Sequence, residues 1–409
     1  MEKEAKSKLY VGVDTHKHFH AVCVLDETGK TVCEQTYEAS AVGYKSLEKD
    51  LRGLGEVVRV AIEGTSCYGR GLCEYLLNRN FDVYEALSPG KRPYSPDGKT
   101  DAIDALAAAR LAFWDQCPGM PKTHSGHSED LALLCSARDS AIKEMTSVGN
   151  AVQGLIVKAK DHLKDKLSTL KGEPLMKSIL KMRKSASEPE LLALKSLAKR
   201  WMMAKEQAQI LEKAMADIVN THFAPLASAC CVGTLCAAEL VAIAGDNPER
   251  FGSEAGFAKS LGVSPIPASS GNTHHMRLNR RGSRQGNKVI HRIAIVRLSN
   301  DKRTQDYVAK KMAEGKTKKD AIRCLKRFIA REIYGLLLQC SKTTYPLPDL
   351  KAMRKQCKLT QVQVAALLKT SYSKLSLLER GLIRDLDLEA RYKELLFKQN
   401  KLRFGSLQI

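Results

Sequence analysis

The chain has 409 residues, 44% of them hydrophobic, and its 66 Lys and Arg against 45 Asp and Glu give a formal net charge of +21. This length and composition predict a folded chain of two or more domains, and the excess of cations indicates a polyanion as partner. The charge is uneven, because residues 1–111 carry 15 basic and 17 acidic side chains whereas residues 271–335 carry 18 and 5. We therefore expect one region to hold cations and another to bind phosphate.

The cysteines and the apolar runs argue against two other classes of protein. No CxxC pair occurs among the twelve cysteines, and most of them lie in apolar runs, so we interpret them as reduced core residues rather than zinc ligands. The N-terminus has no apolar segment typical of a signal peptide, and the run from Ala229 to Gly245 contains Glu239 and is too short to span a bilayer. A cytoplasmic protein without membrane contact is expected.

The first part of the chain alternates between strand and helix patterns. Apolar, β-favouring runs at 9–14, 18–26 and 31–37 predict three strands in a meander, since turn-like residues separate them. The elements expected next are a helix near 41–54, a buried strand at 57–64, a helix near 70–79, a strand at 81–87 and, after a loop with three prolines, a helix that KTDAID (99–104) begins. This alternation predicts an α/β layer within residues 1–120.

The rest of the chain is predicted to be mainly helical. Residues 121–221, rich in Ala, Leu, Lys and Glu, indicate two or more long helices and a coiled-coil-like arm. Residues 222–342 are expected to form short helices, a basic loop rich in Gly and Ser at 267–288, and amphipathic helices. The segment TTYPLPD (343–349) has the composition of a linker, and residues 348–400 are predicted to form a small helical module.

Four acids lie where predicted strands end or the next helix begins. Asp14 ends the first strand, Glu63 ends the fourth, and Asp101 and Asp104, three residues apart, share one face of the helix after the fifth. Strand ends of an α/β layer converge on one edge, so the four carboxylates are expected to meet and to bind Mg²⁺, two ions of which would stabilise the attacking and leaving oxygens of a phosphodiester. The alternative is an exposed helix start, where acids favour the helix dipole.

Six motifs, in this order, resemble those of one protein family: VGVDTHK, AIEGT, KTDAIDA, GVSPIPASSG, RLNRRGSRQGN and CLKRFIAREIY. They are similar to motifs of the DEDD transposases of the insertion-sequence 110 family, and the resemblance runs from about residue 9 to 337. It implies a RuvC-like, RNase H-type fold for the N-terminal domain. The family's four metal-binding acids match Asp14, Glu63, Asp101 and Asp104, so the resemblance favours the metal site over the exposed helix start.

The loop PASSGNT contains Ser269 and Ser270 and is followed by five cations: Arg277, Arg280, Arg281, Arg284 and Lys288. By its residues alone the loop fits either a turn that contacts phosphate or a serine nucleophile, because cations neutralise the phosphate oxygens next to the attacked phosphorus. The family pairs its acidic site with a serine of a C-terminal transposase domain, and Ser270, beside Gly271, matches that serine better than Ser269. The family commonly has two glycines after RLNR, and in this chain Arg281 stands in place of one of them.

Two further segments fit contacts with nucleic acid. CCVGTLCAAEL (230–240) resembles the hairpin of a helix-hairpin-helix element, in which backbone N–H groups contact phosphate, although Cys231 occupies a position that is often glycine. GKTKKDAIRCLKRFIARE (315–332) places cations such as Lys326 and Arg327 on one face and apolar residues on the other. Packing without DNA contact and a solvated charged face are the respective alternatives.

Residues 353–381 are similar to the Cro/repressor type of helix-turn-helix, a module that most members of the transposase family lack. The similarity implies that Tyr372, Ser373 and Lys374 begin a recognition helix that reads base edges in a major groove, with Gln361 at the start of the preceding helix. Lys369 replaces the usual turn glycine, so it must adopt a positive φ or shift the turn. The alternative role is a contact with another protein.

The sequence therefore predicts an insertion-sequence transposase or recombinase that cleaves and rejoins double-stranded DNA with Mg²⁺ and a serine nucleophile. The family implies a homo-oligomer, a dimer or tetramer in which one subunit's acids work with another's serine, and for some members a structured guide RNA from the element. Two alternatives remain. A metal-dependent RuvC-like endonuclease or resolvase would hydrolyse DNA without the serine, and a DNA-binding regulator would have no catalytic function.

Overall fold

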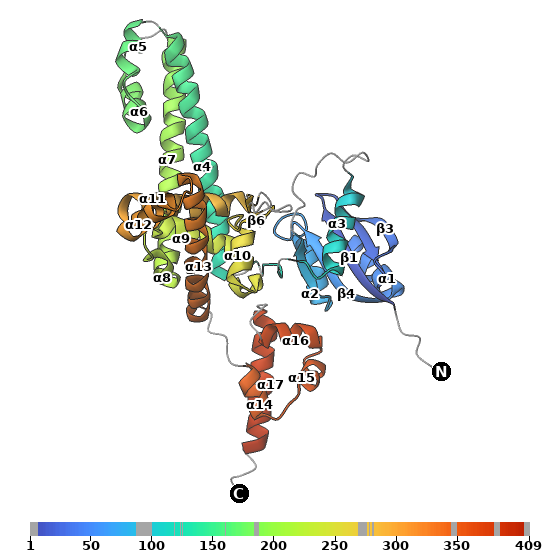
Figure 1. The fold of residues 1–409 in the computed structure, drawn as a ribbon. Helices are drawn as coiled ribbons and strands as arrows, with labels where there is room; N and C mark the ends of the chain where they lie inside the picture. The colour runs from blue at the N-terminus through green and yellow to red at the C-terminus, as the bar shows by residue number, and fades with distance from the viewer. Residues whose placement is uncertain are drawn as a thin grey trace. The chain divides into compact units, whose positions relative to one another are not determined.

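The computed structural model describes residues 7–86, 100–117, 119–122, 124, 126–159, 161–183, 188–268, 276–277, 279, 282–344, 350–379 and 385–404. The chain forms two compact units: Met1–Ser125 together with Ala244–Ile409 is one, and Gly126–Ile243 is the other. Figure 1 shows the main sheet in blue, a long helical pair in green, and the helices of the C-terminal part in yellow to red. Within the described residues, no helix combines the length and the apolar character needed to cross a lipid bilayer.

A mixed five-stranded sheet forms the N-terminal part of the chain. Its strands are β1 (Lys8–Thr15), β2 (Phe19–Leu25), β3 (Thr31–Glu38), β4 (Glu56–Glu63) and β5 (Val83–Ala86), in the spatial order β3-β2-β1-β4-β5. The pairs β1/β2 and β2/β3 are antiparallel, whereas β1/β4 and β4/β5 are parallel. The helices of this region are α1 (Ala41–Leu54), α2 (Arg70–Asn78) and α3 (Asp101–Phe113). The arrangement fits the predicted α/β, RNase H-like N-terminal domain, including its three-stranded meander.

Side chains of β1 alternate between the two faces of the sheet. Val11 and Val13 are fully buried in the core to which α1 and α2 contribute. Tyr10 lies on the opposite face, where the small residues of α3 pack against the sheet. By the same alternation, Gly12 and Asp14 belong to the face that α3 covers.

Gly12 brings α3 into direct contact with the sheet. A Cβ atom at this position would lie 2.0 Å from the backbone nitrogen of Ala109 and 2.2 Å from the backbone oxygen of Ala105. Both distances are far below van der Waals contact, so this close approach of helix and strand requires glycine. The first turn of α3 is thereby held beside the end of β1.

The second unit is helical. α4 (Gly126–Lys158) and α7 (Glu188–His222) pack along each other, and α5 (Asp161–Leu167) and α6 (Gly172–Lys181) add to the core at one end of the pair. The long helices predicted for this part of the chain are therefore present. A turn joins α8 (Ala224–Ala227) to α9 (Gly233–Ala244), and in it Cys231 has a φ of 56°, a conformation that favours glycine.

Helices also dominate residues 244–344. They are η1 (Pro248–Phe251), α10 (Glu254–Ser260), α11 (Arg284–Asn300), α12 (Lys302–Ala313) and α13 (Lys318–Thr344), and β6 (Ile266–Pro267) pairs with β7 (Met276–Arg277). The prediction of a loop over 267–288 is wrong at its end, because α11 already begins at Arg284. Ser283 caps this helix by accepting a hydrogen bond from the backbone N–H of Gly286 at 3.0 Å. Serine and glycine here mark a helix start and not a loop.

Over residues 350–379 and 385–404, the described part of the C-terminal module, there are four helices: α14 (Leu350–Gln356), α15 (Gln361–Leu367), α16 (Tyr372–Glu379) and α17 (Leu386–Phe404). Buried apolar side chains from all four share one core: Leu350, Val364, Leu375, Leu378, Leu388, Tyr392 and Leu396. Thr360 and Gln363 form a reciprocal capping box at the start of α15. In the turn after α15, Lys369 has a φ of 51°, which is the first of the two outcomes predicted for a lysine in place of the turn glycine.

Candidate metal centre and nucleic-acid interface

Two acids lie at the ends of neighbouring strands. Asp14, near the end of β1, is 9% exposed. Glu63 ends β4, the parallel neighbour of β1, and Val13 pairs with Ile62 just before the two acids. The hydroxyl of Thr15 donates a hydrogen bond to the backbone oxygen of Glu63 at 2.7 Å. The two strand ends are therefore fixed side by side.

The first turn of α3 supplies the other two acids. Thr100 caps the helix, because its side chain accepts a hydrogen bond from the backbone N–H of Ile103. Asp101 follows at the first helical position and is half-buried, and Asp104 is 9% exposed. Since the contact at Gly12 holds α3 on the sheet, both acids come to the edge where β1 and β4 end. Among the described residues, Asp14 and Asp101 place carboxylate oxygens within 4.8 Å of each other, whereas Glu63 and Asp104 do not belong to that close group and act on Asp14 through their charges.

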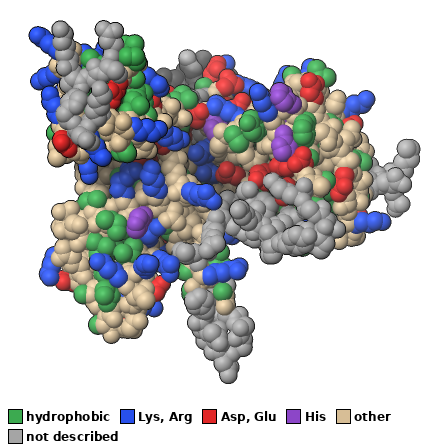
Figure 2. Space-filling view, turned by 90° about the horizontal axis from the view of Figure 1, so that it is seen from above, with side chains coloured by type: hydrophobic (Ala, Val, Ile, Leu, Met, Phe, Trp, Pro, Cys, Tyr) green, Lys and Arg blue, Asp and Glu red, His purple; other side chains and the backbone are tan. Residues whose placement is uncertain are grey.

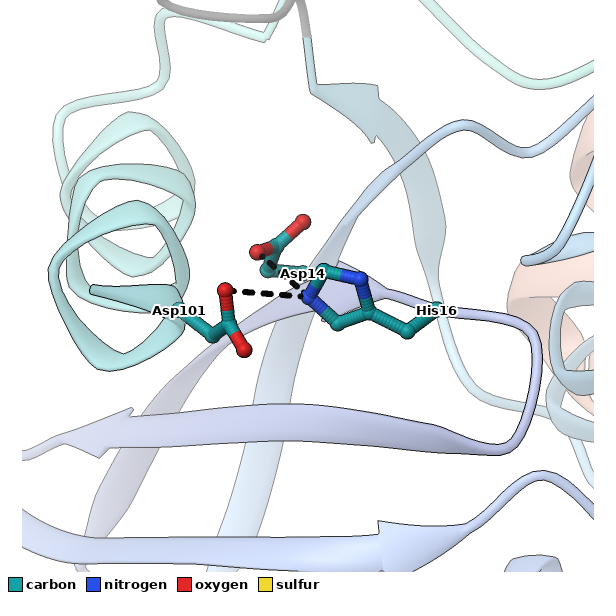
Figure 3. Close-up of side chains that lie close together, drawn as sticks. All are labelled: Asp14, His16 and Asp101. Carbon is teal, nitrogen blue, oxygen red and sulfur yellow. Dashed lines mark ion pairs between the residues drawn. The ribbon is translucent and has the colours of Figure 1, made fainter. Parts of the chain in front are cut away.

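His16, the residue after β1, joins these acids. Its Nε2 lies 3.3 Å from Oδ2 of Asp14 and 3.2 Å from Oδ1 of Asp101. Figure 3 shows the imidazole ring between the end of β1 and the first turn of α3, with one nitrogen toward both carboxylates. One ligand atom from each of the three residues lies within 4.8 Å of the others. A single metal ion could contact all three.

The electrostatics of this cluster fit a cation. Burial raises the pKa of Asp14, the negative charges of Glu63, Asp104 and Asp101 raise it further, and His16 acts in the opposite direction. A raised pKa means that the protein's own groups do not fully compensate the ionised carboxylate. Divalent ions with oxygen ligands would supply that compensation. The donor set therefore fits Mg²⁺ or a related divalent ion.

The cations predicted to bind nucleic acid differ in their exposure. Four are exposed: Arg277 on β7, Arg284 and Lys288 on α11, and Arg327 on α13. Lys326 is half-buried, its amine donates a hydrogen bond to the side-chain oxygen of Asn287, and burial lowers its pKa. Figure 2 shows many Lys and Arg side chains on the face in view. Four predicted residues lie outside the described ones: Ser269, Ser270, Arg280 and Arg281.

Two of the four module residues predicted to read DNA are engaged inside the module. The amide of Gln361 donates a hydrogen bond to Glu379 at 2.7 Å. The amine of Lys374 lies 2.9 Å from a carboxylate oxygen of Asp385. Tyr372, the first residue of α16, is 53% exposed, whereas Ser373 is half-buried. Of the four, Tyr372 presents the most accessible side chain.

Gly12 and His16 belong to the site and were not singled out from the sequence. A signal was available, because positions 12, 14 and 16 share one face of an extended segment. The sequence did not reveal that this face meets the first turn of a helix, since strand alternation says nothing about what covers each face. Because α3 packs on this face, Gly12 is needed for the helix to approach β1, and His16 comes to face Asp101 in the first turn of the helix.

Two family models match the chain. The transposase model for the DEDD domain of IS110 elements matches residues 11–159, which contain all four acids, and the model for transposases of the IS116/IS110/IS902 family matches residues 224–309, which contain the serine loop. Among curated proteins, the comparison finds no match. The two matched segments together span more than half of the 409 residues. By these matches, the chain belongs to the IS116/IS110/IS902 family of transposases.

Proposed function

We propose that this transposase cleaves and rejoins DNA strands at the sheet edge, with two Mg²⁺ ions bound by Asp14, Glu63, Asp101 and Asp104. The observation that supports the proposal is that a carboxylate oxygen of Asp101 lies within 4.8 Å of a carboxylate oxygen of the buried Asp14, while the charges of Glu63 and Asp104 also raise the pKa of Asp14. Such a cluster of like charges destabilises a metal-free domain. Bound divalent ions would relieve the repulsion and make the cluster useful.

The ions would neutralise the scissile phosphate and stabilise the attacking and leaving oxygens. The chain's own residues determine the geometry. The cap at Thr100 and the close approach at Gly12 fix the first turn of α3 relative to β1, which sets the separation of Asp101 from Asp14. Exposed cations such as Arg284 and Arg327 are suited to bind the DNA backbone and hold its register.

We assign the nucleophile to Ser270, with Ser269 as the second choice. Its hydroxyl oxygen would attack the scissile phosphorus, forming a serine phosphodiester and breaking the bond to the leaving deoxyribose oxygen. Because the phosphodiester is preserved, attack by another deoxyribose hydroxyl would rejoin the strands without ATP. The match of residues 224–309 to the family, which includes this loop, supports the assignment.

A covalent-complex assay tests this mechanism. The protein is incubated with Mg²⁺, a labelled DNA junction from its own element and RNA transcribed from the flanks, then denatured and separated on a gel. We expect labelled protein in the wild type and none in Ser270→Ala or Asp101→Asn, while Ser269→Ala retains the band. Cleaved DNA without labelled protein, unchanged in Ser270→Ala, would instead identify a hydrolytic endonuclease.

The C-terminal module is proposed to bind DNA through α16. The capped start of α15, the tight turn at Lys369 and the exposed Tyr372 at the start of α16 support this role. In the full chain, Tyr372→Ala should weaken binding to element-end DNA by roughly 1–3 kcal/mol, as measured by fluorescence polarisation. Unchanged affinity would favour a contact with another protein.

A structured guide RNA and a homo-oligomer, dimer or tetramer, complete the proposal. The net charge of +21 is compatible with an RNA partner, and the family resemblance is the stronger support for both. Light scattering of the purified chain, alone and with RNA from the element's flanks, measures the oligomeric state, and a monomer in both conditions would contradict the homo-oligomer. In the covalent-complex assay, cleavage that is the same with and without this RNA would contradict the guide RNA.

A further inference from the structure

The ring of His16 is held in one orientation by the turn between β1 and β2. Its backbone N–H donates a hydrogen bond to the backbone oxygen of Phe19 at 3.0 Å, and its ring lies 4.8 Å from the ring of Phe19 between centroids. Two other histidines follow in the same segment but do not meet the acids. His18 is exposed, and His20 is fully buried with its ring stacked on Tyr44.

The nitrogen of His16 that faces the acids is in an unusual setting. The side chain as a whole is 37% exposed, but Nε2 is buried and makes no well-aligned hydrogen bond with the described residues. Its contacts with Asp14 and Asp101, at 3.3 and 3.2 Å, are close in distance but not in hydrogen-bond direction. A nitrogen that points between two carboxylates without a directed hydrogen bond is suited to bind the same metal ion as they do.

The distances support that arrangement. Adjacent ligands of an octahedral ion with bonds of about 2.1 Å lie roughly 3.0 Å apart. The two nitrogen–oxygen distances of 3.2 and 3.3 Å are close to this value. An ion could therefore enter with small side-chain adjustments, and Figure 3 shows the three side chains converging from the strand end, the turn and the helix.

We propose that His16 is a ligand of one bound ion, together with Asp14 and Asp101, and that its nitrogen makes the site prefer first-row divalent ions such as Mn²⁺ over Mg²⁺. The inference rests on the metal site of the proposed function. Mg²⁺ favours oxygen ligands, whereas imidazole suits first-row transition metals, so one nitrogen donor shifts the preference in their direction. A site of four carboxylates, with oxygen ligands only, would lack this source of preference for Mn²⁺ over Mg²⁺.

Pulsed electron paramagnetic resonance of Mn²⁺ bound to the full chain tests the assignment. A directly bonded imidazole gives a ¹⁴N modulation of the Mn²⁺ signal, and we expect it in the wild type. His16→Ala should abolish the modulation and weaken Mn²⁺ binding by about tenfold. Mg²⁺ binding, measured by competition, should change less. His16→Gln, which keeps a polar side chain, should also lose the modulation.

His18→Ala is the matched control, because it removes an exposed histidine two residues away and should keep both the modulation and the affinity. Bound Mn²⁺ without ¹⁴N modulation in the wild type would overturn the role of His16 and leave the carboxylate site intact. Equal losses of Mn²⁺ and Mg²⁺ affinity in His16→Ala would overturn the preference. A wild-type chain that binds neither ion, or binding that survives Asp14→Asn, would overturn the proposed metal site itself.

Discussion

Two buried carboxylates in this protein have opposite electrostatic environments. Around Asp14, in the sheet domain, burial and the neighbouring acids raise the pKa. The side chain of Glu379, in the C-terminal module, is only 1% exposed. Its burial alone would raise the pKa, but hydrogen bonds from Arg354, Tyr392 and Gln361 outweigh that effect and hold the pKa below its usual value.

The contacts explain the difference. Arg354 donates two hydrogen bonds to Glu379, at 2.6 and 3.0 Å, and Tyr392 and Gln361 donate one each, at 2.6 and 2.7 Å. These donors come from α14, α15 and α17, so the carboxylate joins the helices of the module. Asp14 instead faces acids and one imidazole. A compensated buried acid stabilises a fold, whereas an incompletely compensated one is available for a cation that the chain does not supply.

Breaking the compensation of Glu379 should have the largest effect on stability. In Arg354→Met the carboxylate stays buried and loses two charge-assisted hydrogen bonds, so the module should lose roughly 3–5 kcal/mol. Hydrogen exchange of the amides in α15 and α16 measures the loss. Lys398→Met removes an exposed ion pair with Glu394 and should leave the exchange unchanged. Equal protection in Arg354→Met and the wild type would mean that Glu379 does not need its arginine.

Gly12→Ala should disrupt the acidic site through the backbone. The added Cβ would collide with Ala105 and Ala109 of α3, so the domain should lose about 3 kcal/mol and the acids of α3 should move away from Asp14. Denaturant unfolding and Mn²⁺ affinity measure the two effects. Gly53→Ala on α1, where no atom lies within 4 Å of the added Cβ, is the control and should be neutral or stabilising. A fully stable, metal-binding Gly12→Ala would contradict the close contact.

A bound divalent cation, which would compensate the negative charge around Asp14, should stabilise the sheet domain. At a Mg²⁺ concentration about a hundred times the dissociation constant, the wild type should gain roughly 2.7 kcal/mol by mass action. Asp14→Asn should be more stable than the wild type without metal, because a repelled charge is removed, and should gain little from Mg²⁺. Calorimetry of both proteins with and without Mg²⁺ gives the comparison. A metal-free Asp14→Asn less stable than the wild type would show that Asp14 is already compensated.

The two carboxylates should give opposite pH dependences in the metal-free protein. Asp14 has a raised pKa, so the native state binds more protons than the unfolded state, and its region should lose stability as the pH rises from about 3.8 through that raised pKa. Glu379 has a lowered pKa, so its contribution is present above about 4.5 and is lost as the pH falls through the lowered value. Hydrogen exchange of β1 and α16, corrected for intrinsic rates, should therefore show opposite slopes. Asp14→Asn and Glu379→Gln should each flatten only their own slope.

Lys369→Gly should have the smallest effect. Lys369 has a positive φ, which costs a non-glycine residue roughly 1–2 kcal/mol, so glycine should stabilise the module by about 1 kcal/mol. Thermal unfolding followed by circular dichroism measures the gain. Lys355→Gly, within α14 and exposed, is the matched control and should destabilise by a similar amount. Destabilisation in both variants would mean that the side chain of Lys369 has a role of its own.

Local sequence patterns, namely apolar runs and residue spacing, predicted part of the acidic site. The apolar runs that became β1 and β4 end at Asp14 and Glu63, and the spacing of Asp101 and Asp104 places both on one face of a helix. Turn chemistry also predicted that Lys369 would either adopt a positive φ or shift the turn, and the structure has the positive φ. The family resemblance added the role of these acids, which no spacing alone supplies.

The sequence by itself determined the strands of the main sheet, most of the helices and the acids beside them, since side-chain periodicity and turn residues are local properties. Only the tertiary structure decided that β1 lies between β2 and β4, that α3 contacts β1 at Gly12, that His16 faces two carboxylates, and that Gln361 is bound to Glu379. Each of these depends on which distant segments pack together. That choice is made by the burial and hydrogen bonding of the whole chain, so no local pattern contains it.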